Sequence, residues 1–300
     1  MADKKRVLAH LAIFGANLIY GINYSVAKGL MPEHLTPFAF IFCRVFGALI
    51  LFLLFASMRK TDKIERNDFW RLALCGLFGV AGNQLMFFYG LNLTSPINAA
   101  IIMTSNPILV MIFAALIIKA KITATKLAGV FLGLAGAAAL ILHGNQLSVE
   151  SDGLIGDLFI FLNGTSYALY LVLVKPLMSK YSPLTVIKWV FLFGAFYVFP
   201  FGFQEVQQVE WSSFTPTIWY SFIFVVVGTT FLAYLFNIYG LKRLNPTTVS
   251  TYIYSQPLIA SIIAILFYDG ELTFVKVLSA LLIFSGVYLV SIRKSAQTKA

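Results

Sequence analysis

The apolar residues of this chain come in long blocks, several of them about 20 residues long, separated by short polar stretches. A helix needs about 20 apolar residues to cross the ~30 Å hydrocarbon core of a bilayer. Of the 300 residues, 59% are hydrophobic and 11% are charged, whereas a soluble domain carries roughly 25% charged residues. The alternation of apolar and polar positions that a membrane β-barrel needs is absent. The sequence therefore predicts an all-α polytopic membrane protein.

The apolar blocks predict ten membrane helices joined by short connections. Their expected ranges are 8–28, 36–57, 70–91, 97–118, 124–142, 154–174, 183–203, 216–240, 247–268 and 274–292. No small-residue cleavage site follows the basic start from Met1 to Arg6. The first block is therefore predicted to be a membrane helix, not a removable signal.

The basic residues are distributed unevenly between the two sides of these ten helices. Apart from Lys28, Arg44 and Lys276, all Lys and Arg residues fall on one side, which also holds both termini. Cytoplasmic loops are enriched in Lys and Arg, so this side is predicted to be cytoplasmic. The net charge of +10 is then explained by contact with an anionic inner leaflet of the bilayer. Nucleic acid is not an expected partner.

A series of landmarks occurs twice along the chain without a gap. Tyr89-Gly90-Leu91 returns as Tyr239-Gly240-Leu241, and the series continues with the pairs Pro96 and Pro246, and Pro107 and Pro257. The series indicates a duplication, with residues 1–146 and 147–300 as two five-helix repeats. Two copies of an odd number of helices insert upside down relative to each other. Inverted repeats are typical of secondary transporters, whose binding sites lie near the midplane between the halves.

The motifs of both halves resemble the drug/metabolite transporter superfamily, specifically its EamA-type ten-helix family. The matching features are Tyr20-Gly21-Ile22-Asn23 with Lys28, Arg44, Tyr89-Gly90-Leu91 with Pro96, Asn98-Ala99-Ala100 and Pro107, Gly129, Gly133 and Gly136, Asp157-Leu158, Tyr167-Ala168-Leu169-Tyr170, and Tyr239-Gly240-Leu241 with Pro246 and Pro257. The resemblance implies a multi-pass transporter of a bacterial-type inner membrane, often an exporter of amino acids, related metabolites or amphipathic compounds. Tyr20 stands where many relatives have Trp.

Polar side chains recur at helical spacing along six of the predicted helices, three in each half. Polar groups at bilayer depth are costly and need a partner or a role. The predicted substrate-binding set is Asn17, Tyr20, Tyr24, Gln84, Asn98, Asn106, Asn163, Tyr167, Tyr170, Tyr234, Asn237, Tyr252 and Gln256. The alternative is that such groups only bond helices together, at an average of ~0.6 kcal/mol each. Because stripes from both halves are expected to converge, a central cavity is the preferred interpretation.

Three further residues stand out inside apolar blocks. Pro107 and Pro257 are predicted to kink or break their helices at matching points of the two halves and to act in gating, because each removes a backbone hydrogen bond. A kink that serves packing alone is the alternative. Arg44 is charged well inside a block and cannot release its proton at ordinary pH. It is predicted to pair with a substrate carboxylate or with backbone carbonyls, or else to extend outward to the membrane surface.

The sequence lacks several groups that other membrane proteins use. No Asp or Glu lies in the middle of a predicted helix, so uniport or facilitated export is favoured over proton antiport through carboxylates. No metal-binding, catalytic or nucleotide-binding motif is found, so no cofactor, no metal and no enzymatic activity are expected. A channel would ordinarily show a filter loop or a charged ring, so a channel or receptor is a lesser alternative.

The polar stripes suggest a neutral or zwitterionic ligand with an apolar side. A strongly cationic drug would prefer a carboxylate, so amino acids rank first, ahead of cationic drugs, nucleobases and sugars. The fifth and tenth helices carry no polar stripe and contain small residues at Gly129, Gly133, Gly136 and Gly286. They are predicted to lie at the periphery through close helix packing. The protein is expected to be a monomer or a homodimer in the bilayer.

Overall fold

The structure is a computed structural model, and it describes residues 2–31, 33–94, 96–142, 153–259, 262 and 273–292. The side chains of residues 2, 3, 24, 25, 27, 28 and 96–98 lie outside this description. The described chain is helical nearly throughout and contains no strand. It is an all-α protein, as the apolar blocks predict.

The described residues up to Leu142 form nine helical elements. They are α1 (Ala2–Lys28), α2 (Pro37–Ser57), η1 (Arg66–Asp68), α3 (Phe69–Gly76), η2 (Leu77–Ala81), α4 (Gly82–Leu93), α5 (Pro96–Met103), α6 (Asn106–Ile118) and α7 (Ala124–Leu142). The elements that follow within the described residues are α8 (Gly153–Val174), α9 (Leu177–Lys180), α10 (Pro183–Gln207), η3 (Trp211–Ser213), α11 (Pro216–Ile223), η4 (Phe224–Leu232), α12 (Ala233–Arg243), α13 (Pro246–Thr251), η5 (Tyr252–Tyr254) and α15 (Phe274–Ser291).

Eight helices of the described chain are long and apolar enough to cross a membrane. They span Pro37–Ser57, Arg66–Leu93, Ala99–Ile118, Ala124–Leu142, Gly153–Lys180, Pro183–Gln207, Pro216–Arg243 and Phe274–Ser291. These correspond to the second to eighth and the tenth predicted helices. The first predicted helix is helical as α1, and most of the second half of the ninth lies outside the described residues. The protein is therefore polytopic, and the count of ten stays a prediction.

Helices begin where a Ser or Thr stands directly before a proline. The Thr36 side chain accepts a hydrogen bond from the backbone N of Ala39, and Ser182 accepts one from Thr185. Thr215 caps α11 in the same way. Such a cap satisfies an N–H group that has no partner inside the helix, and proline at the first position has no N–H to lose. This local chemistry explains why the sequence predicts these starts to within a residue or two.

Two membrane helices contain π-helical segments, and two are interrupted near a proline. The π segments are η2 and η4, and η4 includes residues 227–231, which the repeat aligns with 77–81. Helix α5 ends at Met103, and α6 begins three residues later, at Asn106, with Pro107 in its first turn. The 3₁₀ segment η5 ends three residues before Pro257. The α-helical geometry thus changes near both prolines, and that Pro107 and Pro257 kink or break their helices and act in gating stays a prediction.

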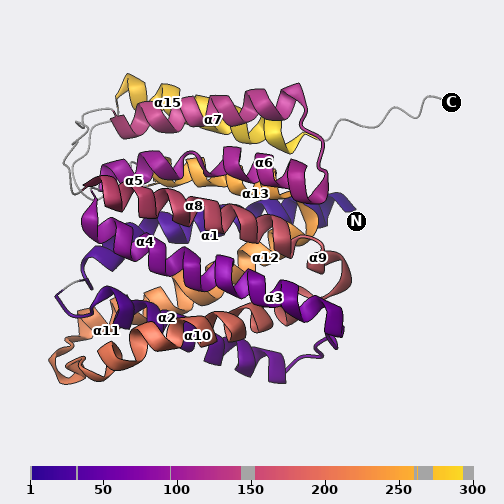
Figure 1. Ribbon diagram of the computed structural model, residues 1–300. Coiled ribbons are helices and arrows are strands. Elements are labelled where there is room, and N and C mark those ends of the chain that lie inside the picture. Colours follow the sequence, from indigo (N-terminus) through magenta and orange to yellow (C-terminus); the bar gives the residue numbers. More distant parts are fainter. Residues whose placement is uncertain are drawn as a thin grey trace.

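Helices α7 and α15 lie side by side along one edge of the bundle, and α2 and α10 pack together along the opposite edge (Figure 1). Between the two edges lie α1, α4, α8, α12 and α13 (Figure 1). Glycines let α7 and α15 approach closely. A Cβ atom at Gly286 would lie 2.6 Å from the carbonyl oxygen of Gly129 and 2.7 Å from the backbone N of Gly133. The fifth and tenth predicted helices are peripheral, as expected from their small residues.

The close contact between α7 and α15 leads to a stability prediction. We expect Gly286→Val to lower the apparent melting temperature of the detergent-solubilised protein, because the new side chain meets backbone atoms that cannot rotate away. Overpacking of this kind costs about 1–3 kcal/mol. Leu281→Val on the same helix is the control, since Leu281 is 61% exposed and faces no close neighbour backbone. Equal melting temperatures for the two variants would contradict the glycine contact.

Candidate functional site

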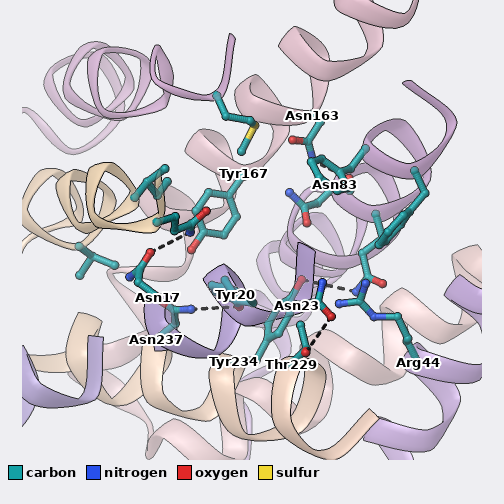
Figure 2. A pocket seen from close by; sticks show the side chains of 17 residues that line it. Asn17, Tyr20, Asn23, Arg44, Asn83, Asn163, Tyr167, Thr229, Tyr234 and Asn237 are labelled. Carbon is teal, nitrogen blue, oxygen red and sulfur yellow. Dashed lines mark hydrogen bonds between the residues drawn. The ribbon is translucent and has the colours of Figure 1, made fainter. Parts of the chain in front are cut away.

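A cavity of about 120 Å³ lies in the middle of the bundle. The space is enough for several waters, each of which needs roughly 10–15 Å³ on this measure. Its walls come from α1, α2, α4, α5, α8, η4, α12, α13, η5 and the helical residues that follow η5, and not from α7 or α15. Figure 2 shows labelled Asn, Tyr, Thr and Arg side chains converging on this space from several helices. We refer to it as the central cavity.

Arg44 is the one charged side chain that lines the central cavity among the described residues. It is only 5% exposed, so it does not extend outward to the membrane surface. Its Nε donates to the hydroxyl of Thr230 at 3.0 Å, and its guanidinium lies 5.3 Å and 5.1 Å from the ring centres of Phe40 and Phe88. Both ion pairs of the described residues involve Lys180, so none of the described carboxylates pairs with Arg44.

The π segment η4 positions the partner of Arg44. The Thr230 hydroxyl donates to the carbonyl oxygen of Val225 at 2.8 Å, five residues earlier. Its oxygen therefore faces Arg44 as an acceptor. The neighbouring Thr229 donates to the side-chain oxygen of Asn23 at 3.0 Å, which ties η4 to α1. Wide turns of this type occur frequently at functional sites.

Amide and phenol side chains bond to one another across the central cavity. Asn17 accepts from Gln256 at 2.8 Å, and Asn237 donates to the Tyr20 hydroxyl at 3.2 Å (Figure 2). Both bonds connect α1 to elements far along the chain. Since each group has a neutral partner, the wall presents a polar surface whose only charge, among the described residues, is that of Arg44.

The facing wall is built from α4, α8 and α12. The Tyr234 hydroxyl donates to the carbonyl oxygen of Gly79 at 3.1 Å, and Gln84 approaches the same hydroxyl at 3.5 Å. Asn163 donates to the carbonyl oxygen of Asn83 at 2.6 Å. Gln84 and Tyr234 are thus in contact.

Many of the predicted substrate-binding residues line the central cavity, together with Arg44. They are Asn17, Tyr20, Gln84, Asn163, Tyr167, Tyr234, Asn237 and Gln256. The side chains of Tyr24 and Asn98 lie outside the described residues. Their role as substrate ligands stays a prediction.

Three of the predicted residues do not line the central cavity. Asn106 is fully buried and donates to the carbonyl oxygen of Gly164 at 2.8 Å, so it bonds α6 to α8. The Tyr170 ring fills the space beside Gly79 in η2. Tyr252 bonds to His10 at 2.8 Å, away from the cavity. A 3₁₀ turn has three residues per turn, and in η5 it is Ile253 that faces the cavity.

Other cavity residues were not in the predicted set. Asn23, Asn83 and Thr229 supply polar groups, and the apolar part of the wall is formed by Phe87, Phe88, Met103, Val249 and Ile253. Asn83 stands beside Gln84 in the sequence, and Asn23 lies three residues after Tyr20, so both could have been found by extending the stripes. Thr229 lies inside η4, where a regular helical period does not hold.

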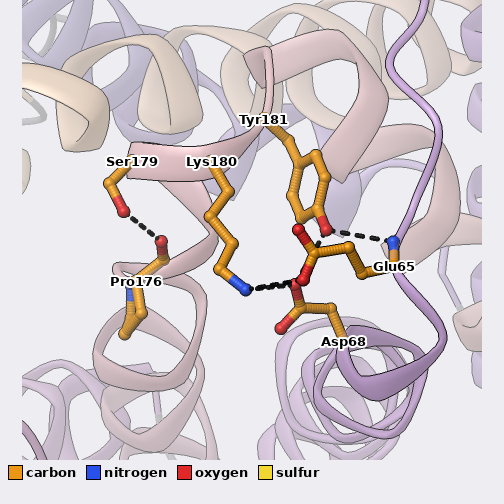
Figure 3. A network of polar contacts seen from close by, with 6 residues as sticks. All are labelled: Glu65, Asp68, Pro176, Ser179, Lys180 and Tyr181. Carbon is orange, nitrogen blue, oxygen red and sulfur yellow. Dashed lines mark hydrogen bonds and ion pairs between the residues drawn. The ribbon is translucent and has the colours of Figure 1, made fainter.

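Charged residues connect two segments of the chain away from the central cavity. The Lys180 ammonium lies 2.9 Å from a carboxylate oxygen of Asp68 and 3.2 Å from one of Glu65. The Tyr181 hydroxyl donates to Asp68 at 2.8 Å and accepts from the backbone N of Glu65 at 3.1 Å (Figure 3). We call Glu65, Asp68, Lys180 and Tyr181 the charged clamp. It connects the segment between α2 and α3 to the segment between α8 and α10.

A second contact joins the same two segments. A carboxylate oxygen of Asp62 accepts from the backbone N of Ser182 at 2.6 Å and from the Thr185 hydroxyl at 3.1 Å. The backbone hydrogen bond from Ser182 is the largest of the effects that hold the pKa of Asp62 below its ordinary value. Asp62 therefore stays ionised at neutral pH, and the contact weakens only as the pH falls through its lowered pKa.

Membrane-length apolar helices around a central cavity lined by both polar and apolar side chains define a multi-pass membrane protein. The EamA-like transporter family matches residues 7–142 and 154–292. The chain therefore belongs to the EamA-like transporter family, as its motifs predict. It is a membrane transporter and not an enzyme.

Relatives from three kinds of organism match nearly the full chain. The "Uncharacterized transporter YyaM" of Bacillus subtilis is 26% identical over 96% of this chain and 94% of its own length. An uncharacterized transporter of Archaeoglobus fulgidus is 24% identical over 95% of this chain and 98% of its own. "Protein WALLS ARE THIN 1" of Arabidopsis thaliana is 22% identical over 98% of this chain and 85% of its own. The bacterial relative supports a cell-membrane location.

A solved crystal structure of a protein has a similar fold. It superposes with a TM-score of 0.75 at 16% identity, and the match covers 94% of this chain and 96% of that one. At this identity the likeness concerns the fold alone.

Proposed function

We propose that this chain is a secondary transporter that exports or facilitates passage of amino acids or related small amphipathic metabolites. It would work in a bacterial-type inner membrane with both termini in the cytoplasm. Residues 1–146 and 147–300 would be inverted five-helix repeats that alternate in opening the central cavity to each side, with the breaks near Pro107 and Pro257 as hinges.

The observation that carries this proposal is the buried Arg44 in the central cavity, which pairs with none of the carboxylates that the structure describes. Burying an ion costs several kcal/mol unless a partner compensates. A guanidinium offers two parallel N–H groups that match a carboxylate, so a substrate carboxylate would complete the site. Apolar groups such as Phe87, Met103 and Ile253 would hold the substrate side chain.

The neutral polar groups of the wall would serve the rest of a zwitterion. Amide oxygens and phenols accept hydrogen bonds from an ammonium group. Of the described residues that line the central cavity, none is Asp or Glu. This composition favours an amino acid over a strongly cationic drug, which would leave Arg44 facing a like charge.

Flux of labelled amino acids into proteoliposomes tests the proposal. We expect saturable flux that differs less than about twofold with and without an imposed pH gradient, because the cavity lacks a carboxylate that could carry a proton. Empty liposomes are the control. Flux that requires the gradient would contradict facilitated transport. Flux of nucleobases or cationic drugs in place of amino acids would contradict the role of Arg44.

A further inference from the structure

A second hollow lies on the outer surface of the bundle, between the start of α1 and the end of α15. It has a volume of about 510 Å³ and is lined by Arg6, His10, Tyr252, Phe284, Val287, Tyr288, Ser291 and Ile292. It shares no lining residue with the central cavity. We call it the lateral groove. The start of α1, beside the N label in Figure 1, lies at the same end of the molecule as α9.

The lateral groove is polar and basic at its outer end. Arg6 donates from Nη2 to the carbonyl oxygen of Ser291 at 2.6 Å. This bond holds the guanidinium in place and uses one of its five N–H donors. The two ion pairs of the described residues both involve Lys180, so Arg6 has no carboxylate partner among them. His10 lies one helical turn deeper, with Nδ1 2.8 Å from the Tyr252 hydroxyl.

The inner part of the lateral groove is apolar and open to lipid. Phe284, Val287 and Tyr288 lie on one face of α15, because residues three and four apart are neighbours on a helix. Phe284 is 53% exposed and Tyr288 is 68% exposed. Exposed apolar groups on a membrane helix face acyl chains. The groove therefore has a charged outer end and an apolar inner part that faces lipid.

We propose that the lateral groove binds an anionic phospholipid of the leaflet at the charged end. The phosphate would pair with Arg6 and His10, and an acyl chain would lie along Phe284 and Tyr288. The polarity of the groove changes along the helix axis in the same order as that of a phospholipid. Basic pockets between membrane helices are known to hold anionic headgroups, and a guanidinium matches phosphate through two parallel hydrogen bonds.

The bound lipid is placed to act on transport. Tyr252 belongs to η5, and the next residue, Ile253, lines the central cavity. Three residues further, Gln256 bonds to Asn17 across that cavity. A lipid that holds Tyr252 and His10 together therefore supports the wall that the solute meets. The lipid site does not depend on which solute is transported.

Lipid retention by the purified full-length protein tests the proposal without a transport assay. Native mass spectrometry would count phosphatidylglycerol adducts on the wild type, on Arg6→Gln and on Lys121→Gln. Lys121 is exposed and lies in the segment between α6 and α7, outside the groove. We expect Arg6→Gln to retain phosphatidylglycerol roughly fivefold less tightly, since a basic residue near the surface contributes ~1 kcal/mol. Lys121→Gln should behave as the wild type, and Tyr288→Ala should also lose adducts.

Several outcomes would overturn the lipid site. One is equal retention of phosphatidylglycerol by Arg6→Gln and Lys121→Gln, and another is equal retention of phosphatidylcholine and phosphatidylglycerol by the wild type. Binding of soluble glycerol phosphate as tight as that of the lipid would assign the groove to a free phosphate compound. Adducts that form only after removal of residues 293–300 would assign it to the chain's own end. The melting temperature of each variant would also be measured, and a value equal to that of the wild type would exclude loss of folding as the cause of lost lipid adducts.

Discussion

Replacing Arg44 with glutamine is expected to lower amino acid flux at least ~100-fold while the protein stays folded. A hydrogen bond to a charged group contributes about 1.5–3 kcal/mol, and a bidentate pair makes two. Since ~1.4 kcal/mol is tenfold, loss of the pair removes two orders of magnitude or more. Glutamine fits the polar pocket beside Thr230 but carries no charge.

The melting temperature of this variant distinguishes a loss of substrate binding from a loss of folding. Burying an ion costs several kcal/mol unless it is compensated, and Arg44 pairs with none of the described carboxylates, so we expect Arg44→Gln to keep the wild-type melting temperature or to exceed it. Arg44→Lys should retain about a tenth of the flux, because lysine keeps the charge but not the planar fork. Arg59→Gln, at an exposed position, is the matched control. Wild-type flux in Arg44→Gln would remove the proposed carboxylate site.

The helical elements follow closely from local features of the sequence. Thr36 and Ser182 precede prolines, and each caps the helix that begins there. The apolar blocks between such caps have the length of a membrane helix. The glycines of the fifth predicted helix indicate a peripheral pair, and Gly129 meets Gly286 at that pair. These features depend on neighbouring residues, so one sequence is enough to predict them.

Thr229 and Ile253, two cavity residues that the sequence did not predict, lie where the chain departs from the regular α-helix. A stripe at 3.6 residues per turn assumes one period along the whole helix. The π segment η4 breaks that period and brings Thr229 and Thr230 toward Asn23 and Arg44. The 3₁₀ segment η5 instead takes the Tyr252 side chain away from the central cavity, toward His10. No local signal in an apolar run marks where such a segment occurs.

The sequence also does not predict which group a buried polar side chain bonds to. Asn106 and Asn163 are both buried amides on membrane helices, and both belong to the polar stripes from which the substrate-binding set was predicted. Only the packed structure shows that Asn106 bonds to Gly164 between two helices while Asn163 reaches the cavity wall. The same holds for Arg44, whose alternatives of outward extension or burial differ in tertiary contacts and not in sequence.

A change at the charged clamp is also expected to have a large effect on flux. Glu65 and Asp68 belong to the first proposed repeat, whereas Lys180 and Tyr181 belong to the second. Lys180 and Glu65 are 47% and 66% exposed at their side chains, so that pair contributes little, but Asp68 is only 10% exposed. Asp68 also accepts from Tyr181. If the two halves move relative to each other during transport, the contacts of Asp68 must break in every cycle.

A covalent link across the charged clamp is therefore expected to stop transport. Asp68→Cys and Lys180→Cys would be combined in a background where Cys43 and Cys75 are replaced by alanine, and joined by a short cleavable bifunctional thiol reagent. We expect flux to fall to the level of empty liposomes and to return when the linker is cleaved, because a linked clamp keeps this end closed. The two single-cysteine variants, treated alike, should keep their flux. Full flux through the linked protein would show that the solute passes without separating these segments, and alternating access at this end would be wrong.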